Sequence, residues 1–490
     1  MKKFNISKSA FTKGLQCQKA LYLRKHYPEL EDQVSEAQQA IFDTGHNIGH
    51  LAKELFPGGV DLGAYIPGQI NKVFEETGKL IQQKQIIYEA GFSYDDNLCF
   101  SDIVVPKEDK WLIYEVKAST SVKDIYLWDA AFQYYLATSS GIEVEDISIV
   151  HINNEYERVG ELDIQQLFTI ESVLELIIPM QTEVKRQIDR LKTMLNEDKV
   201  PDIDIGPHCH DPYPCSFLGH CWKHIPDYSV FNISRLKTDK KFELYNEGIL
   251  DITDIPDDFG LSHSQRLQVE GEKNGTEIIN KEAITSFVNN LNYPLYFMDF
   301  ETFNPSVPMF DHSKSYQMIT FQYSLHIQEG AGSEIIHKEF LAETNGDPRI
   351  PFIKQLIKDV GETGDILVYN QAFECTRLKE VAKDFPQYEN AINVILDRIV
   401  DLMVIFSKKD YYTPAMKGSY SIKAVLPALV PGFGYDGLDI ADGGTASLAF
   451  EHLFYEKDQD KTDKIRSNLL KYCKMDTLAM VEILKVLSNI

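Results

Sequence analysis

The chain has 490 residues, of which 74 are acidic and 49 are basic, and its formal net charge is −25. A chain of this length is too long for one hydrophobic core, so we expect two or three domains. The acidic balance argues against a protein that coats nucleic acid through its net field. It does not exclude a nuclease, because bound divalent ions invert the local charge of an acidic site. No stretch is apolar enough to cross a bilayer and the first residues lack a signal-peptide core, so we expect no membrane contact and a cytoplasmic protein.

The first expected domain, residues 1–225, contains strand-like runs at 98–105, 110–118 and 146–153. In "CFSDIVVPKEDKWLIYEVKAST", Asp102 precedes a turn, and Glu115 and Lys117 share one face of the next strand because they are two residues apart. Two carboxylates can hold a divalent metal while the lysine positions water and offsets charge on a phosphate. A surface hairpin with alternating charges gives the same pattern, but the run "WLIYEV" around Glu115 is too apolar for an exposed strand.

This trio resembles the catalytic motif of the RecB-like branch of the PD-(D/E)xK nucleases, which implies a restriction-endonuclease-like domain. In that branch a downstream helix carries a glutamine followed by a tyrosine. "WDAAFQYYLA" supplies Gln133, although the spacing to its tyrosines differs. A histidine near the start is also common there, and "DTGHNIGHLAKELF" offers His46 and His50.

Four of the seven cysteines form a second pattern in this region. Cys17 lies at the head of an expected helix, and Cys209, Cys215 and Cys221 crowd into "HCHDPYPCSFLGHC". One cysteine before the nuclease core and three after it resemble the RecB-like nucleases of the AddB type and the CRISPR-adaptation exonucleases. The resemblance implies a [4Fe-4S] cluster with a structural role, and thiolate ligation of iron suits four cysteines.

Zinc is the alternative cofactor, because histidines beside these cysteines can complete a Cys3His site. The candidate histidines are His208, His210, His220 and His224. Free structural cysteines are the third possibility. We interpret the other three as small core or near-site residues, which is the commoner fate of a free cysteine. They are Cys99, Cys375 and Cys473.

Residues 226–292 are expected to form a small helical connector. "LYNEGILDITDIPDDFGLSHSQRLQVE" contains two short helical patterns around a Gly-Ile turn, which is similar to a helix-hairpin-helix element. Such an element would present backbone N–H groups to a phosphate backbone, and a plain helical linker is the alternative.

The third expected domain, residues 293–490, has strand-like runs at 293–300, 318–327, 334–342 and 366–369 and ends in a long helix. This order predicts a mixed sheet flanked by helices, and the fold class of the whole chain is therefore α/β. In "YPLYFMDFETFNP", Asp299 and Glu301 share one face of the first strand while Phe300 points into the opposite layer.

Further carboxylates follow in order along this domain. Glu374 lies in the first turn of a helix, Asp401 lies among apolar residues, and Tyr472 and Asp476 are four apart on the last helix. Together they can bind two divalent ions about 4 Å apart for phosphodiester hydrolysis. Oxygen ligands favour Mg²⁺ or Mn²⁺.

The layout of residues 293–490 resembles the DnaQ-like (DEDD) 3′–5′ exonucleases of the RNase H-like superfamily. Asp299 and Glu301 match the first motif, and Tyr472 with Asp476 matches the last motif of the tyrosine branch, DEDDy. The middle motif differs, because Glu374 stands where these enzymes usually carry an aspartate; Asp401 is a possible substitute or supporting ligand.

The whole chain resembles an uncharacterised bacterial family that fuses a cysteine-bearing RecB-like nuclease to a DnaQ-like exonuclease. The resemblance implies a metal-dependent nuclease that acts on DNA or RNA, with one site in each terminal domain. Lys417, Tyr420 and Lys423 are candidates for a groove that binds the substrate. The alternatives are an inactive nucleic-acid-binding scaffold built on nuclease folds, and one active domain with the other as a substrate clamp.

Overall fold

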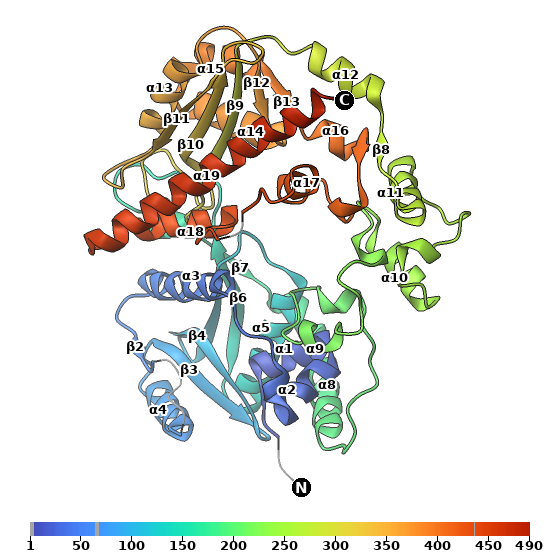
Figure 1. The fold of residues 1–490 in the computed structure, drawn as a ribbon. Coiled ribbons are helices and arrows are strands. Elements are labelled where there is room, and N and C mark those ends of the chain that lie inside the picture. Colours follow the sequence, from blue (N-terminus) through green and yellow to red (C-terminus); the bar gives the residue numbers. More distant parts are fainter. Residues whose placement is uncertain (1–3, 64–67, 436) are drawn as a thin grey trace. The chain divides into compact units, whose positions relative to one another are not determined.

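The computed structural model describes residues 4–63, 68–435 and 437–490, which fold as two compact α/β units (Figure 1). Unit 1 comprises Met1–His224 and Ser306–Tyr316, and unit 2 comprises Ile225–Pro305 and Gln317–Ile490. Within the described ranges, no helix has the length and apolar character needed to cross a membrane.

Unit 1 is built on a mixed sheet with the strand order β2-β3-β4-β5-β6-β7, and β1 pairs with the start of β4. β3, β4 and β5 form an antiparallel meander, and β6 runs parallel to β5. The strands predicted at 98–105, 110–118 and 146–153 are confirmed as β4, β5 and β6. The strands are β1 (Ile6–Ser7), β2 (Val60–Asp61), β3 (Ile87–Tyr94), β4 (Asn97–Lys107), β5 (Lys110–Lys117), β6 (Val144–Ile152) and β7 (Phe168–Ser172).

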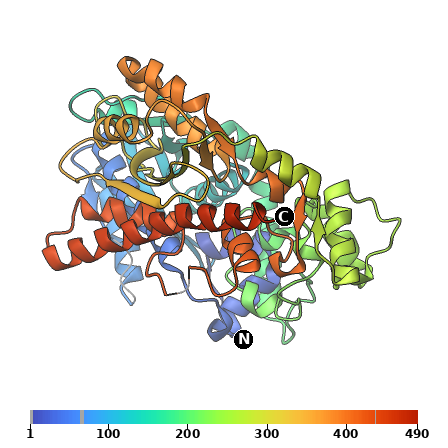
Figure 2. The same cartoon turned by 45° about the horizontal axis from the view of Figure 1, so that its top comes forward.

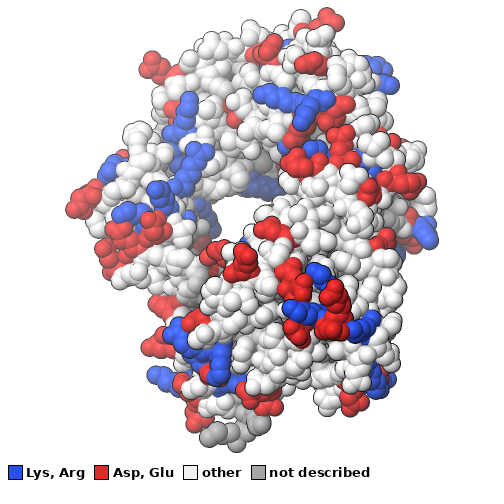
Figure 3. Space-filling model, turned by 180° about the vertical axis from the view of Figure 1, so that it is seen from behind, with Lys and Arg blue, Asp and Glu red and all other residues white. Residues whose placement is uncertain are grey.

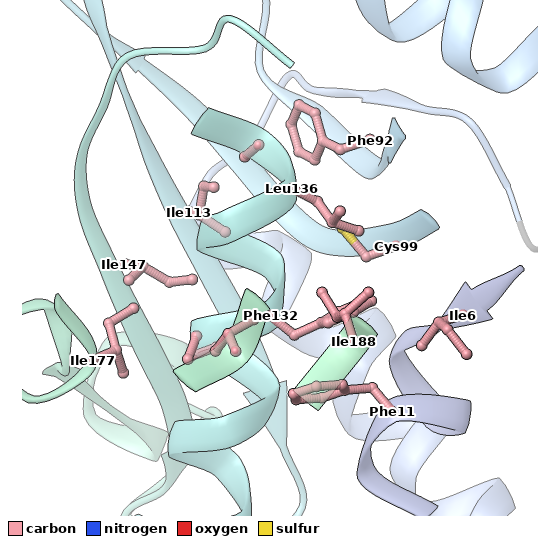
Figure 4. Packing of buried hydrophobic residues seen from close by; sticks show 14 of the residues in the cluster. Ile6, Phe11, Phe92, Cys99, Ile113, Phe132, Leu136, Ile147, Ile177 and Ile188 are labelled. Atoms are coloured by element: carbon pink, nitrogen blue, oxygen red, sulfur yellow. The ribbon is translucent and has the colours of Figure 1, made fainter. Parts of the chain in front are cut away.

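Helices cover both faces of this sheet. On one face, Phe11, Phe132 and Ile188 pack together from α1, α5 and α8 (Figure 4). Alternate residues of β5 enter opposite cores, since Ile113 joins that cluster and Tyr114 packs with the α3 side. Glu115 and Lys117 therefore share the face of Ile113, which is the face covered by α5. The helices are α1 (Lys8–Gln16), α2 (Gln18–His26), α3 (Glu36–Ala52), α4 (Ile70–Gln82), α5 (Asp124–Ser139), α6 (Ile164–Leu167), α7 (Leu174–Ile177), α8 (Gln181–Leu195) and α9 (Leu218–Cys221).

The segment Ser306–Tyr316 packs with unit 1, whereas the sequence placed it in the C-terminal domain. The Tyr316 hydroxyl donates to the Ala118 carbonyl at 2.9 Å, and the Gly160 N–H donates to the Asp311 carboxylate at 2.8 Å. These contacts join segments far apart in sequence, which no local pattern indicates.

Unit 2 is built on a sheet with the order β11-β10-β9-β12-β13. β10 is antiparallel to both β9 and β11, whereas β12 is parallel to both β9 and β13. The strands predicted at 293–300, 318–327, 334–342 and 366–369 are confirmed as β9, β10, β11 and β12. The strands are β9 (Leu295–Phe303), β10 (Ile319–Gln328), β11 (Ile335–Leu341), β12 (Ile366–Val368) and β13 (Ile399–Asp401).

The two faces of this second sheet carry different helices. The long helix α19 lies along β9 and β10 (Figures 1 and 2) and shares a core with Leu295 and Phe297. Met298 and Phe300 point to the other face, where they pack with α13, α14 and α15. The predicted alternation in β9 is therefore confirmed, and Asp299 and Glu301 face the α19 side. The main helices are α13 (Arg349–Asp359), α14 (Gln371–Asp384), α15 (Glu389–Leu396), α16 (Val404–Ser407), α17 (Ile422–Leu429), α18 (Gly443–Leu453) and α19 (Gln459–Leu487).

Residues 226–292 pack as part of unit 2 instead of forming a separate connector. The short strand β8 (Ile278–Ile279) pairs with β14 (Tyr411–Tyr412), and the Tyr412 hydroxyl donates to Glu272 at 2.7 Å. The two expected helical patterns are present, with Gly248 in the left-handed region after the first. The helices of this segment are α10 (Thr238–Asn246), α11 (His263–Asn274) and α12 (Lys281–Asn289).

Candidate functional site

β9 and α19 bring the first and last predicted motifs of unit 2 together. Asp299 and Glu301 project from the β9 face that α19 covers, and Tyr472 and Asp476 lie one turn apart on α19. An oxygen of Asp299, an oxygen of Glu301 and the sulfur of Cys473 all lie within 4.8 Å of one another. Cys473, predicted to be a small core or near-site residue, is buried beside the carboxylates.

The middle motif lies at the start of α14. Asn370 has φ 83°, in the left-handed region, and the helix that follows carries Glu374 in its first turn. The Glu374 side chain is 1% exposed, and one of its oxygens has no hydrogen-bond partner among the described residues. Asp401 accepts the backbone N–H groups of Asn370 at 3.1 Å and Met403 at 2.9 Å, so its carboxylate holds the turn before α14.

Burial and mutual repulsion destabilise the charged forms of these carboxylates. Burial, with a contribution from Asp401, raises the pKa of Glu374 to about 8. Burial and then the charge of Asp476 raise the pKa values of Asp299 and Glu301 well above the usual range. Glu374 adds to the rise in the pKa of Asp299, so its charge acts on the β9 carboxylate. A bound divalent cation would relieve this repulsion.

Side chains outside the predicted metal ligands complete the site. The Tyr435 hydroxyl donates to Asp476 at 2.5 Å, and the Lys423 ammonium donates to the Tyr472 hydroxyl at 3.3 Å. Burial raises the pKa of Asp476 to about 6, and the hydrogen bond from Tyr435 and the charge of Lys423 oppose a larger rise. Burial and the charge of Asp476 raise the pKa values of both tyrosines, so each hydroxyl stays protonated near neutral pH. Lys423 therefore lies at this site, and its role in a substrate groove stays a prediction.

The predicted residues of unit 1 also meet in one buried network. The Lys117 ammonium lies 2.7 Å from Glu115 Oε1, and the Gln133 amide donates to Glu115 Oε2 at 2.8 Å. Asp102 accepts the backbone N–H of Val116 at 2.7 Å. Burial and then the charge of Glu115 raise the pKa of Asp102 to about 8.

Two side chains outside the predicted set give this network its charge balance. Lys8 of α1 donates to Glu115 Oε1 at 2.7 Å, and Asp129 of α5 accepts from Lys117 at 2.5 Å. Burial by itself would raise the pKa of Glu115, but the charges of Lys117 and Lys8 hold that pKa well below its usual range. A divalent ion at Glu115 would therefore compete with an ammonium group already bonded there, which distinguishes this site from the site in unit 2.

The histidines considered for unit 1 lie elsewhere. His46 and His50 are exposed on α3, and no hydrogen bond among the described residues joins either one to the network around Glu115. The structure therefore does not bring them together with Asp102 and Lys117.

All four predicted cluster cysteines line one small cavity of about 20 Å³. Burial raises the pKa values of Cys17, Cys215 and Cys221, and the neighbouring Cys209 adds to each rise. Phe217 packs beside them and is fully buried. The cavity thus lies between the junction of α1 and α2, which carries Cys17, and residues 209–221 near the end of unit 1.

The spacing of these thiols bears on which cofactor they suit. Tetrahedral zinc, with bonds of about 2.3 Å to sulfur, brings its ligand sulfurs within about 4 Å of one another. His208 also lines the cavity, and its Nε2 lies 3.8 Å from Cys209 Sγ. The structure thus gathers the four thiols and one of the candidate histidines, and the choice between an iron–sulfur cluster and zinc stays a prediction.

Comparison with known proteins connects the chain to an uncharacterised domain. Residues 296–421 match the family model described as Domain of unknown function (DUF2779). The chain is also 27% identical, over 281 residues, to the uncharacterized protein UU173 of Ureaplasma parvum serovar 3 (strain ATCC 700970). That alignment covers 52% of this chain and 40% of the relative, so the chain spans less than half of the relative's length. The matched domain includes Asp299, Glu301 and Glu374 and ends before α19.

The structure thus assembles most of the predicted site residues in three places, which are the unit 2 carboxylate site, the network around Glu115 and the cysteine cavity. Three residues of these sites, Lys8, Asp129 and Tyr435, were not predicted from the sequence. Asp129 could have been predicted from the sequence, since it lies four residues before Gln133 and therefore on the same face of α5. Lys8 and Tyr435 come from segments with no motif that relates them to the carboxylates.

Proposed function

We propose that the protein is a metal-dependent nuclease whose unit 2 hydrolyses phosphodiester bonds at the 3′ ends of DNA or RNA. Asp299, Glu301, Glu374 and Asp476 would hold Mg²⁺ or Mn²⁺. The observation that carries the proposal is the convergence of these carboxylates, from three segments far apart in sequence, at one buried site. Burying several acids together costs free energy that a bound cation offsets.

The topology of unit 2 supports the same proposal. An antiparallel meander of β9, β10 and β11 is followed by β12 and β13, which run parallel on the other side of β9. A mixed sheet flanked by helices is the fold that the resemblance to RNase H-like exonucleases implies, and its central strand β9 carries Asp299 and Glu301.

The side chains around the carboxylates suit hydrolysis. Divalent ions held by these carboxylates would supply activation of water and stabilisation of the departing oxygen. The protonated Tyr472 hydroxyl can donate to a water or to a phosphate oxygen, and Lys423 orients that hydroxyl through its hydrogen bond. Tyr435 holds Asp476 in one orientation through its short hydrogen bond.

Unit 1 is the second candidate nuclease site, similar to the PD-(D/E)xK enzymes. The observation in its favour is the buried network of Asp102, Glu115, Lys117 and Gln133. Because Lys8 and Lys117 already compensate Glu115, we place the principal metal site in unit 2. Unit 1 then acts either as a second nuclease or as a substrate clamp, with a [4Fe-4S] cluster on Cys17, Cys209, Cys215 and Cys221 stabilising its fold.

The proposal is tested by digestion of 5′-labelled single- and double-stranded DNA and RNA with Mg²⁺, Mn²⁺ or EDTA. We expect metal-dependent shortening from the 3′ end, which Asp299→Asn abolishes. Asp397→Asn is the matched control, because Asp397 is an exposed acid of the same unit. Lys117→Ala determines whether unit 1 contributes. Failure of the wild-type protein to digest any substrate with either metal would leave a scaffold built on nuclease folds as the better account.

A further inference from the structure

Unit 2 contains a pocket whose lining residues are neighbours in the chain of residues at the carboxylate site. A pocket of about 620 Å³ forms where residues 231–235 meet residues 417–422, and Tyr369 and Asn370 complete its wall. This volume is within the range of roughly 300–1,000 Å³ that is usual for ligand sites. The three walls come from segments far apart in the sequence, and all belong to unit 2.

The charge of this pocket is opposite to the charge of the chain. Arg235, Lys241 and Lys417 line it, and no acidic residue is among the described residues of its lining. The chain as a whole carries a charge of −25, and acidic and basic side chains are interspersed on the face drawn in Figure 3. Cationic groups gathered in a concave site concentrate their field and attract anions.

The pocket also offers aromatic surface and hydrogen-bond donors. The Arg235 guanidinium lies 4.9 Å from the centre of the Tyr420 ring, and its Nε donates to the Tyr420 hydroxyl at 2.9 Å. As far as the structure describes the chain, the two terminal nitrogens of Arg235 have no acceptor and Lys417 has no ion-pair partner. Phe231 and Tyr369 add further aromatic lining. Cations beside aromatic rings are the combination that binds the phosphates and bases of single strands.

Each wall of the pocket holds one residue in a disfavoured backbone conformation. Arg235, Asn370 and Lys417 have φ values of 55°, 83° and 48°, in the left-handed region that favours glycine. Such residues persist where the surrounding structure holds them, and they gather at binding sites. The surrounding structure therefore fixes the backbone positions from which Arg235, Lys417 and Asn370 line the pocket.

Two of these walls lead directly to the carboxylate site. Tyr369 and Asn370 precede α14, whose first turn carries Glu374. Residues 417–422 lead into α17, where Lys423 bonds to Tyr472. A ligand in the pocket would thus lie beside the proposed catalytic residues.

We propose that this pocket binds a nucleotide unit of single-stranded nucleic acid, with the cations on its phosphate and an aromatic ring against its base. The strand held there would reach the carboxylates with its 3′ end. This last step rests on the proposed nuclease function, whereas nucleotide binding itself does not. A free nucleotide has the same chemistry, and competition with adenosine monophosphate separates the two sources.

The test is the affinity of the full-length protein for 5′-fluorescein-labelled 12-residue strands of DNA and RNA, measured by fluorescence anisotropy in EDTA. Lys417→Ala and Arg235→Ala are expected to weaken binding by about tenfold and to lower the slope of log K against log salt by about one. The matched control is Lys354→Ala, because Lys354 is an exposed lysine of unit 2 outside the pocket. Adenosine monophosphate is added as competitor. Displacement of the strand only by a large excess identifies the single strand as the occupant, and displacement at equal concentration identifies the free nucleotide.

The outcomes separate this inference from the proposed function. Wild-type affinity in both pocket variants would refute nucleotide binding by the pocket, even if the protein digests nucleic acid. An equal loss of affinity in Lys354→Ala would refute it too. If only the pocket variants lose affinity and the protein digests no substrate, the result would support nucleotide binding by the pocket and refute the proposed nuclease activity.

Discussion

The substitution Glu374→Gln tests whether the buried charges of the unit 2 carboxylates destabilise the metal-free protein. Glutamine keeps the shape of the side chain and removes its charge. Because Glu374 is 1% exposed and its pKa is raised from 4.5 to about 8, the metal-free folded protein keeps a proton there that the unfolded chain loses. Stability of the wild-type protein therefore falls as pH rises from about 4.5 to about 8 and levels off above that window.

The size of the effect follows from the same shift. One pKa unit is worth about 1.4 kcal/mol, so at pH 7 the cost of keeping Glu374 buried is on the order of 3 kcal/mol. At pH 5 it is below about 1 kcal/mol. Glu374→Gln removes this cost, and a domain of this size gains about 2–4 °C in melting temperature per kcal/mol.

The assay is thermal unfolding in EDTA at pH 5 and pH 7, followed by circular dichroism and by tryptophan fluorescence. All three tryptophans lie in unit 1, at Trp111, Trp128 and Trp222, so a dichroism transition without a fluorescence change reports unit 2. We expect Glu374→Gln to raise the melting temperature of the unit 2 transition at pH 7 and to change it little at pH 5. Mg²⁺ should then stabilise the wild-type protein more than the variant.

Glu362→Gln is the control for this experiment, because Glu362 is exposed in the same unit and its substitution should leave the transition in place. Wild-type stability that does not decline between pH 5 and pH 7 without metal would refute the predicted cost of burying Glu374. A Glu374→Gln variant no more stable than the wild-type protein at pH 7 would refute it as well.

Three further predictions concern the two carboxylate sites and the cysteine cavity. Tyr435→Phe removes the hydrogen bond that holds down the pKa of Asp476, so the acidic limb of the pH–rate profile with Mg²⁺ should move to higher pH; an unmoved limb would contradict the assignment. Cys17→Ser should lower the iron content and visible absorbance of anaerobically purified protein and reduce the melting temperature reported by tryptophan fluorescence, and unchanged iron would argue against the cluster. Lys8→Met removes one ammonium from Glu115, so calorimetric titration should show Mn²⁺ binding to unit 1 about tenfold more tightly, since a charge at 4 Å is worth on the order of 1–4 kcal/mol. Unchanged affinity would show that Lys8 does not compete with metal.

The strands and the positions of their carboxylates were predictable from the sequence because they depend on local periodicity. Alternation along β9 correctly assigned Phe300 to one layer and the pair Asp299 and Glu301 to the other. The apolar run around Glu115 likewise identified a buried strand. In such cases the residues that decide the structure are neighbours in the chain.

Other contacts were not predictable because they join segments whose relation exists only in the folded unit. Lys8 reaches Glu115 from the first helix, and Tyr435 reaches Asp476 from an irregular segment. Segment 306–316 belongs with unit 1 through contacts such as the bond from Tyr316 to Ala118. No spacing or composition along one stretch of sequence indicates such pairs.

The central claim is that the unit 2 carboxylates hold divalent cations, and counting bound Mn²⁺ by electron paramagnetic resonance tests it most directly. The measurement compares the wild-type protein with Asp299→Asn and with the exposed control Asp397→Asn. We predict about two ions per chain at the unit 2 site in the wild-type protein and in the control. We predict loss of these ions in Asp299→Asn. Equal Mn²⁺ binding by Asp299→Asn and the wild-type protein would contradict the account.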